Sequence, residues 1–289
     1  MTNIVLGGST PSEGFELKSA RFSTGDYLTF TPTASGNKKV ATLSFWMKNC
    51  GQSGPVGATG HTVIFAAGSS TSDISLWQFL ATTPTFQINN YKSVPGNGYW
   101  TTTSVYRDYS AWQHFLISYN GDTAAVKLFV NGEETTFTNS GDNWLDDDVA
   151  FNTAGVPMYF FRSSNGQHSS VKDVYLAEVY WLDGTAVTDA SSFGETNAGT
   201  NQWEPKNPTD IKPTLTFGNN GFYLPFSNDA LATSFPDNSL GSAFIPTEAL
   251  SVDVLLVAGG GGGGGGYGNG AGGGGGAGGF RALASTAVT

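Results

Sequence analysis

Charge is scarce in this sequence. Charged residues make up 12% of its 289 residues, about half the ~25% of an average soluble protein. The 13 Lys and Arg are outnumbered by 23 Asp and Glu, which gives a formal net charge of −10. The cations nowhere cluster into the basic patch that binds nucleic-acid phosphates, and the acidic balance disfavours attraction to anionic membranes. We therefore expect no nucleic-acid binding and no membrane insertion.

Cysteine and targeting signals are almost absent as well. Cys50 stands alone, so neither an intrachain disulfide nor a cysteine metal cluster can form. We interpret Cys50 as a small buried apolar residue rather than a reactive thiol. The N-terminus lacks the basic and apolar regions of a signal peptide, and the longest apolar candidate, Val254 to Ala258, is too short to span a bilayer. We expect a soluble protein made in a cytoplasm.

Helical patterns are also missing, and alternating strand patterns replace them. In residues 41–49 one face would hold Leu43, Phe45 and Met47, and the segments 112–121, 126–137 and 156–184 alternate similarly. Asn131-Gly132 suits the positive φ angles of a two-residue hairpin turn. Many short strands with turns roughly every ten residues, and no helices for parallel crossovers, predict an all-β antiparallel sandwich.

Composition divides the chain into four predicted segments. Residues 1–14 are an N-terminal arm and residues 15–195 the sandwich. Residues 196–250 hold six of the 12 prolines together with many aromatic residues, so we expect an irregular extension packed on the sandwich, with one short strand near residues 221–226. Residues 251–289 begin a glycine-rich module, in which 17 of the 21 residues from 259 to 279 are glycine.

Three stretches resemble known protein families. AWQHFLISYNGDTAAVKLFVNGEE resembles the paired strands of laminin-G or concanavalin-A-like jelly rolls. YLAEVYWLDGTAVTDASSFGETN, followed by QWEPK and NNGFYLPFSND, resembles tail-fibre-like proteins of marine bacteriophages, and the glycine tract resembles modules of the same phage proteins. The resemblance implies a jelly roll in a virion structural protein, located in the tail or a surface appendage, with other virion proteins and a homotrimer as partners. In such proteins the glycine module continues further, so a fragment or a shortened version is expected here.

Catalytic groups do not converge in the sequence. A glycosidase needs two carboxylates at set separations, but Glu178 and Asp183 are predicted to point to opposite faces of one strand. We interpret Glu178 as a charge satisfied by a neighbouring Lys or Arg, and His114 as a neutral strand histidine. The three histidines lack zinc-ligand spacing. We therefore expect a non-enzymatic protein, with a hydrolase or lyase acting on host polysaccharide as one alternative and a capsid decoration or head-fibre protein as another.

Two kinds of binding site remain open. Calcium is the possible cofactor, because the acidic run at residues 141–148 offers Asp142, Asp146, Asp147 and Asp148, although a solvated acidic loop is the competing interpretation. A host-surface glycan site is predicted where aromatic rings and amides surround a Pro-Gly loop. Its candidate residues are Asn90, Tyr91, Asn97, Tyr99, Trp100, Tyr106 and Tyr109. The alternative for Trp100 is packing in the core or in a subunit interface.

The glycine tract has two interpretations as well. Polyglycine can act as a flexible linker. No charged residue lies between Asp253 and Arg281, however, and apolar strand-like segments bracket the tract. Since ordering glycine costs conformational entropy, shared backbone hydrogen bonds across subunits could offset that cost. We predict ordered packing of the tract across subunits.

Overall fold

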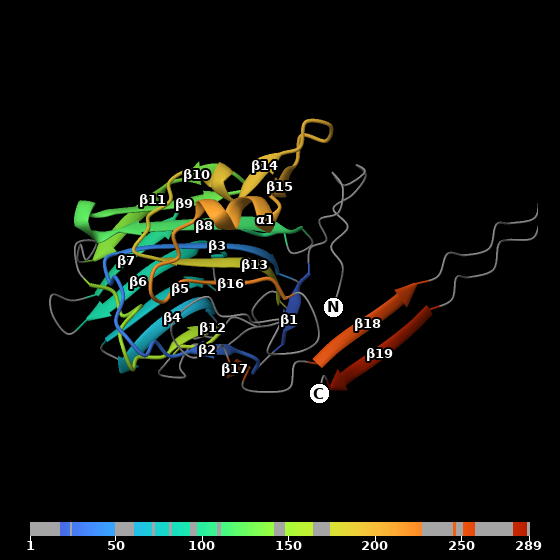
Figure 1. Ribbon diagram of the computed structural model, residues 1–289, viewed down its shortest axis with the longest axis horizontal. Helices are drawn as coiled ribbons and strands as arrows, with labels where there is room; N and C mark the ends of the chain where they lie inside the picture. Colours follow the sequence, from blue (N-terminus) through green and yellow to red (C-terminus); the bar gives the residue numbers. More distant parts are fainter. Residues whose placement is uncertain are drawn as a thin grey trace, which may run out of the picture.

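In the computed structural model of this protein, the described residues are 18–23, 25–49, 61–70, 73–80, 83–92, 97–108, 111–141, 148–163, 174–226, 245–246, 251–257 and 280–287. Cys50, His168, the arm at residues 1–14 and the tract at 259–279 lie outside them. Most of the described strands form two large sheets (Figure 1). Every strand pairing within these sheets is antiparallel. The predicted all-β antiparallel sandwich is therefore confirmed.

The first sheet has seven strands, in the order β1-β13-β3-β8-β9-β10, with β16 also paired to β13. Their bounds are β1 Ala20–Phe22, β3 Val40–Asn49, β8 Gln113–Asn120, β9 Ala125–Val130, β10 Glu133–Thr135, β13 Val174–Asp183 and β16 Phe222–Leu224. The second sheet has eight strands, in the order β11-β7-β6-β5-β4-β12-β2-β17. Their bounds are β2 Leu28–Phe30, β4 Thr62–Ser70, β5 Asp73–Phe79, β6 Phe86–Lys92, β7 Asn97–Thr102, β11 Phe137–Gly141, β12 Met158–Phe160 and β17 Ile245–Pro246.

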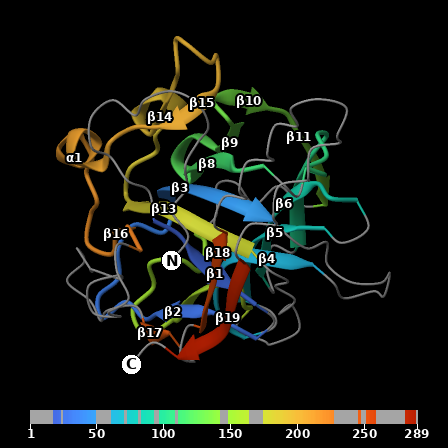
Figure 2. The ribbon, with the colours of Figure 1, turned by 90° about the vertical axis from the view of Figure 1, so that its right-hand side faces the viewer.

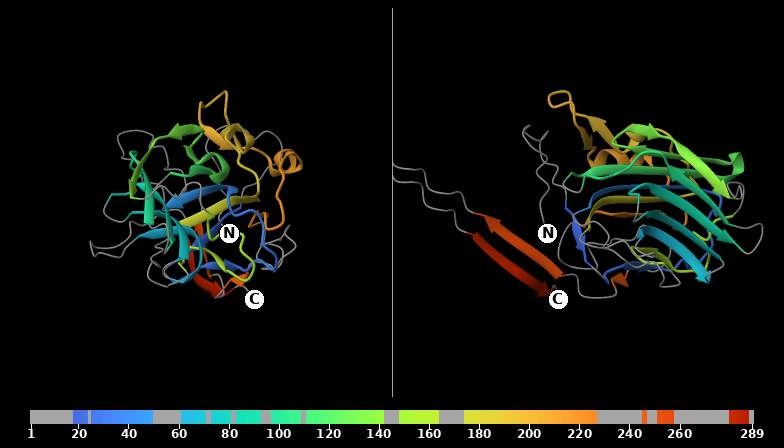
Figure 3. Two further views of the ribbon diagram at one scale, coloured as in Figure 1. Left: turned by 90° about the vertical axis from the view of Figure 1, so that its left-hand side faces the viewer. Right: turned by 180° about the vertical axis from the view of Figure 1, so that it is seen from behind.

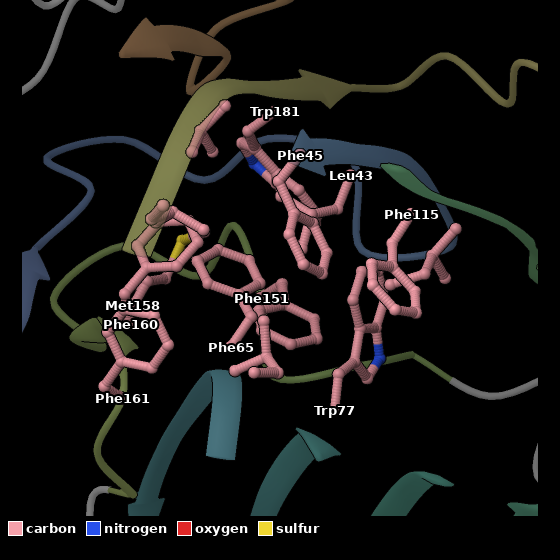
Figure 4. Packing of buried hydrophobic residues seen from close by; sticks show 14 of the residues in the cluster. Leu43, Phe45, Phe65, Trp77, Phe115, Phe151, Met158, Phe160, Phe161 and Trp181 are labelled. Carbon is pink, nitrogen blue, oxygen red and sulfur yellow. The ribbon is translucent and has the colours of Figure 1, made fainter. Parts of the chain in front are cut away.

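The main core lies between the two sheets. Phe45 and other alternate residues of β3 point into this core. Phe45 packs beside Phe115 of the neighbouring strand β8, and both face Phe65 and Trp77 of the opposite sheet, as Figure 4 shows. Phe65 stacks on Phe151 with ring centroids 4.9 Å apart. Buried aromatic side chains carry large apolar areas, so this layer supplies most of the hydrophobic stabilisation of the fold.

Two connections between strands follow from the residues in their turns. Asn131 and Gly132 have φ of 49° and 88° and join β9 to β10, as the two-residue hairpin predicts. The connection from β8 to β9 is longer. It contains a 3-10 turn, η1 (Gly121–Thr123), in which the Asn120 side chain accepts a hydrogen bond from the Thr123 N–H. The short strand expected near residues 221–226 is β16, which joins the seven-stranded sheet.

A third layer covers the outer face of the seven-stranded sheet. It includes the hairpin β14 (Gly194–Thr196) and β15 (Trp203–Pro205), with the short helices η2 (Ala190–Ser192), α1 (Pro208–Ile211) and η3 (Lys212–Thr214). Leu116, Tyr180 and Leu182 of the sheet pack there against Phe193 and Ile211. Figures 1 and 2 show this layer on the side away from the eight-stranded sheet. Residue 195, the predicted end of the sandwich, lies within β14, and the predicted segment limits remain a prediction.

A β-bulge in β13 overturns the strict alternation expected for residues 174–182. The register with β3 shifts between Ala177 and Tyr180, and Glu178 has φ of 48°. Val174 and Leu176 face the main core before the bulge, whereas Val179 and Trp181 face it afterwards. One extra residue in a strand reverses the faces of all residues that follow it.

The segments at residues 251–257 and 280–287 pair as a separate two-stranded sheet, β18 (Ser251–Val257) and β19 (Phe280–Ala287). Neither strand pairs with the sandwich sheets. Figure 3 shows the two strands side by side. This agrees with the expectation of strands on both sides of the glycine tract, while packing across subunits remains a prediction.

Candidate functional site

The predicted glycan residues divide between the two faces of the eight-stranded sheet. Asn90 and Trp100 point inward, because they alternate with outward-facing Tyr91 and Tyr99 on the paired strands β6 and β7. Asn90 is 1% exposed and accepts a hydrogen bond from the Ser75 hydroxyl at 2.8 Å. Trp100 packs against the main core. The expectation that these two residues join an exposed surface is therefore wrong.

The remaining predicted residues are also separated. Tyr106 packs at the margin of the main core, with its ring centroid 5.8 Å from that of Phe79, so it too is absent from the outer face. Asn97 pairs with Tyr91 across β6 and β7. Tyr109 lies outside the described residues. Tyr91 and Tyr99 are placed together on the outer face, with ring centroids 5.8 Å apart in an edge-on contact.

The calcium prediction falls mostly outside the described residues, which exclude Asp142, Asp146 and Asp147. Asp148 is exposed, and its backbone carbonyl accepts a hydrogen bond from the Asn90 amide at 3.5 Å. No group of three or more His, Cys, Asp or Glu side chains suited to a metal ion occurs in the described part of the chain. Calcium remains a prediction.

A row of amides crosses the outer face beside the two tyrosines. Gln78 of β5, Gln87 of β6 and Thr101 of β7 lie opposite one another in register. The Gln78 amide donates to Gln87 Oε1 at 3.2 Å, and the Gln87 amide donates to Thr101 Oγ1 at 3.0 Å. We call Gln78, Gln87 and Thr101 the amide ladder. Both hydrogen bonds run from β5 towards β7, so the acceptor at the start of the ladder, Gln78 Oε1, is not used within it.

Two buried acceptors of this face lack a partner in the part of the chain that the structure describes. There, Gln78 Oε1 and Asn89 Oδ1 make no hydrogen bond, although the two side chains are at most 1% exposed. Asn89 uses its Nδ2 to donate to the Tyr91 hydroxyl at 3.3 Å. Unpaired buried acceptors cost free energy, so they suit a place where a ligand hydroxyl or a water donates. Their neighbours Gln87 and Thr101 are half-buried.

Tyr91, beside the ladder, remains neutral near pH 7. Burial and then the neighbouring Tyr99 hydroxyl raise the pKa of Tyr91 to about 12. Gln78, Gln87, Asn89 and Thr101 have no ionisable side chain, so together with Tyr91 they carry no charge near neutral pH. Gln87, Tyr91, Tyr99 and Thr101 are half-buried, and their accessible parts offer rings and hydrogen-bonding groups.

Glu178 is a buried structural group and takes no part in this face. It lies under the third layer, where both carboxylate oxygens accept hydrogen bonds from the Tyr223 hydroxyl, at 3.0 and 2.8 Å, and Oε2 accepts from the Tyr180 hydroxyl at 3.1 Å. The expectation of a Lys or Arg partner is therefore wrong: tyrosine hydroxyls satisfy the carboxylate. Burial raises the pKa of Glu178 to about 7, opposed by the two tyrosine hydrogen bonds and by the charge of Lys212.

His114 is a buried, neutral strand histidine, as predicted. The Trp203 indole N–H donates to His114 Nδ1 at 3.1 Å, so the remaining ring proton is on Nε2, which lies 2.8 Å from Ser44 Oγ. The His114 ring also stacks on Trp46, with centroids 5.2 Å apart. Burial lowers the pKa of His114 to about 3. The ring joins the third layer to the sheet and faces no solvent.

Comparisons with known proteins match this architecture. A protein-family model described as a glycine-rich domain matches residues 237–289. A comparison with curated proteins finds no match for this chain. Among solved structures, a candidate carbohydrate-binding protein from Bacteroides ovatus is similar at 12% identity and a TM-score of 0.51, covering 80% of this chain and 58% of its own.

Two further structures are similar at lower TM-scores. The laminin α1 domains LG4-5 of mouse share 10% identity at a TM-score of 0.41, with 84% of this chain and 50% of theirs covered. A heptameric pentraxin from Limulus polyphemus shares 15% identity at 0.41, with 59% and 76% covered. The chain thus spans little more than half of the Bacteroides protein and half of the laminin fragment. The likeness to the Bacteroides protein agrees with the all-β sandwich fold.

Among the described residues, no helix is both long and apolar enough to cross a membrane.

Proposed function

We propose that this chain is a non-enzymatic structural protein of a bacteriophage virion, in a tail fibre or other tail appendage, whose sandwich binds host-surface glycans. The observation that carries the binding role is the outer face of β5, β6 and β7. There Tyr91 and Tyr99 lie beside the amide ladder. The buried acceptors Gln78 Oε1 and Asn89 Oδ1 lack a hydrogen-bond donor among the described residues. Saccharides present hydroxyl donors and apolar ring faces, which complement such a surface.

The virion role is supported by the sequence. The segments that resemble phage tail-fibre-like proteins include β13, β14, β15 and β16, which build and cover one side of the sandwich. The match to a glycine-rich domain at residues 237–289 agrees with the glycine module of such proteins. The Bacteroides protein of similar fold is described as a candidate carbohydrate-binding protein. A homotrimer with its glycine tracts packed together is the assembly that we propose.

Glycan binding should depend on Tyr99 and Gln87. On a glycan array followed by calorimetry with the best ligand, Tyr99→Ala and Gln87→Ala should each weaken binding about tenfold or more, because each removes a central contact. Tyr175→Ala is the matched control, since Tyr175 is a half-buried tyrosine on β13 of the other sheet. Equal affinities for all three variants, or no glycan bound by the folded wild type, would reject the site.

The virion assignment has its own measurement. Mass spectrometry of purified particles should detect the chain, and immunogold labelling should place it on the tail. Light scattering of the purified protein should give three times the mass of one chain. Label on the capsid would instead identify a decoration or head-fibre protein, and absence from particles together with a monomeric mass would reject the structural role.

A further inference from the structure

A cationic aromatic cluster lies at the other end of the same outer face. Tyr159 of β12 and Tyr27, just before β2, have ring centroids 6.1 Å apart. The guanidinium of Arg162 lies over both, 4.5 Å from the Tyr27 centroid and 5.9 Å from the Tyr159 centroid. All three side chains are half-buried.

The backbone is strained where it delivers Arg162 to this position. Phe161 has φ of 64°, which is unfavourable for a bulky aromatic residue. Phe160 and Phe161 both pack into the main core, as Figure 4 shows, so the alternation of β12 is broken there. Because Phe161 takes the core position, the next residue returns to the face that holds Tyr159. Such strain costs free energy and persists where the surrounding structure fixes the conformation.

The Arg162 guanidinium has no anionic partner in the described part of the chain. Its contacts there are the two tyrosine rings, although the chain carries 23 acidic residues. The ion pair Lys127–Glu134 shows the ordinary alternative, with Nζ and Oε2 3.0 Å apart on exposed side chains of the other sheet. A guanidinium stacked on aromatic rings keeps its in-plane donors available for a carboxylate or sulfate.

Strand register connects this cluster to the face already described. Tyr159 lies opposite Ala66, Ala66 opposite Leu76, Leu76 opposite Asn89, and Asn89 opposite Tyr99. Neighbouring strands are about 4.8 Å apart, so this row extends over roughly 19 Å. It has a half-buried tyrosine at each end, whereas Ala66, Leu76 and Asn89 between them are each 0% exposed. A chain-like ligand that reached both ends would therefore contact Tyr99 and the cluster of Tyr27, Tyr159 and Arg162, and would not touch the middle of the row.

We propose that Tyr27, Tyr159 and Arg162 form a subsite for an acidic group, a carboxylate or a sulfate, on the glycan that the outer face binds. This inference rests on the proposed glycan binding. The rings would contact the sugar, and the Arg162 donors would pair with its anionic oxygens. The amide ladder, which carries no charge, would contact neutral sugar units of the same chain.

The test uses matched acidic and neutral oligosaccharides with the full-length protein. The probes are oligogalacturonate and its carboxyl-reduced form, and a κ-carrageenan oligosaccharide and its desulfated form, measured by calorimetry at low and at physiological salt. Wild type should bind at least one acidic form more tightly than its neutral counterpart. Arg162→Gln should weaken that binding roughly tenfold to a hundredfold, the range for losing charge-assisted hydrogen bonds. Added salt should weaken wild-type binding and have less effect on the variant.

Two further variants make the result specific. Arg162→Lys keeps the charge but loses the planar fork, so it should retain part of the affinity and confirm that the site is folded. Lys127→Gln makes the same change in net charge on the other sheet and should leave binding unchanged. Equal binding of acidic and neutral forms, unaffected by Arg162→Gln, would overturn the subsite and leave glycan binding standing. If neither form of either probe binds, the subsite is contradicted, and the glycan array separately decides whether the chain binds glycans.

Discussion

Replacing Asp183 with alanine should lower the free energy of unfolding by about 3–5 kcal/mol. Asp183 ends β13 and is 5% exposed. Its Oδ1 accepts hydrogen bonds from the Asn37 backbone N–H at 2.7 Å and from the Asn152 amide at 3.0 Å, and its Oδ2 accepts from the Asn220 backbone N–H at 3.1 Å. These donors come from three segments that are distant in the sequence.

The expected loss follows from the donors that the variant leaves behind. Each buried donor without an acceptor costs about 1–3 kcal/mol. The buried Asn220 N–H would lose its acceptor, the part-buried Asn37 N–H would lose its own, and the Asn152 amide would keep only its bond to the Asn37 carbonyl. Gly36 also packs closely here, because a Cβ at that position would overlap the Asp183 carboxylate. For a domain of this size, about 1 kcal/mol shifts the melting temperature by roughly 2–4 °C. Urea and thermal denaturation would measure the change.

Two variants control for this prediction. Asp183→Asn keeps one acceptor oxygen and should lose less stability than Asp183→Ala. Asp122→Ala removes an exposed carboxylate from η1 and should stay within about 0.5 kcal/mol of wild type. If Asp183→Ala were no less stable than Asp122→Ala, the three hydrogen bonds would not hold these segments together.

Glu178 and His114 should shape the pH dependence of stability in opposite directions. The pKa of Glu178 is raised from 4.5 in the unfolded chain to about 7 in the folded protein. Its contribution to the free energy of unfolding is therefore fully present below pH 4.5 and is lost as the pH rises towards 7. The pKa of His114 is lowered from 6.5 to about 3, so its contribution is present above 6.5 and is lost as pH falls towards 3. Between pH 4.5 and 6.5 these two side chains together bind one titrating proton in each state. In the folded protein it is on the Glu178 carboxyl, and in the unfolded chain it is on the His114 imidazole. These two groups therefore give no net slope there.

Single substitutions should reveal each slope. Glu178→Gln leaves only the His114 effect, so between pH 4.5 and 6.5 the free energy of unfolding should rise with pH, relative to wild type, by about 1 kcal/mol per unit. His114→Gln leaves only the Glu178 effect. Over the same range, the free energy of unfolding of this variant should fall with pH, relative to wild type, by a similar amount per pH unit. Urea denaturation at pH 4.5, 5.5 and 6.5 measures both. Other titrating groups are common to the three proteins and cancel in the differences.

Parallel profiles for wild type and both variants would show that neither group has a shifted pKa in the folded state. The groups around each residue are consistent with the shifts. Glu178 contacts two neutral tyrosine hydroxyls, with Lys212 as the nearby cation, and His114 is surrounded by Trp46, Trp203 and Ser44. Burial dominates at both residues, and it disfavours the charged form of each.

Local sequence chemistry predicted the strands and some turns correctly. Alternation marked β3, β8 and β9, because a strand with one face in the core repeats every two residues. Asn131-Gly132 marked its hairpin, because these residues tolerate positive φ. These features depend on a few neighbouring residues, so the sequence carries them directly.

The candidate site could be predicted only in part. Tyr91 and Tyr99 were identified from an aromatic and amide-rich stretch, but so were Asn90 and Trp100, which alternate with them and point inward. Gln78 and Gln87 were missed because they lie on strands with no conspicuous pattern. The only sign of this polar row is the strand register, which places the polar side chain of Gln78 opposite that of Gln87.

By itself, then, the sequence determined the all-β class, the antiparallel pairing and the acidic, cation-poor character of this protein, since these follow from composition and two-residue periodicity. The tertiary structure decided which side of each strand faces the core. The bulge at Glu178 reverses that choice within β13, and the positive φ at Phe161 reverses it just after β12. It also brought Tyr27 to Arg162 and Asp183 to Asn37, contacts made by strand pairing between distant segments. Such contacts depend on the packing of the whole sandwich, and no local pattern encodes them.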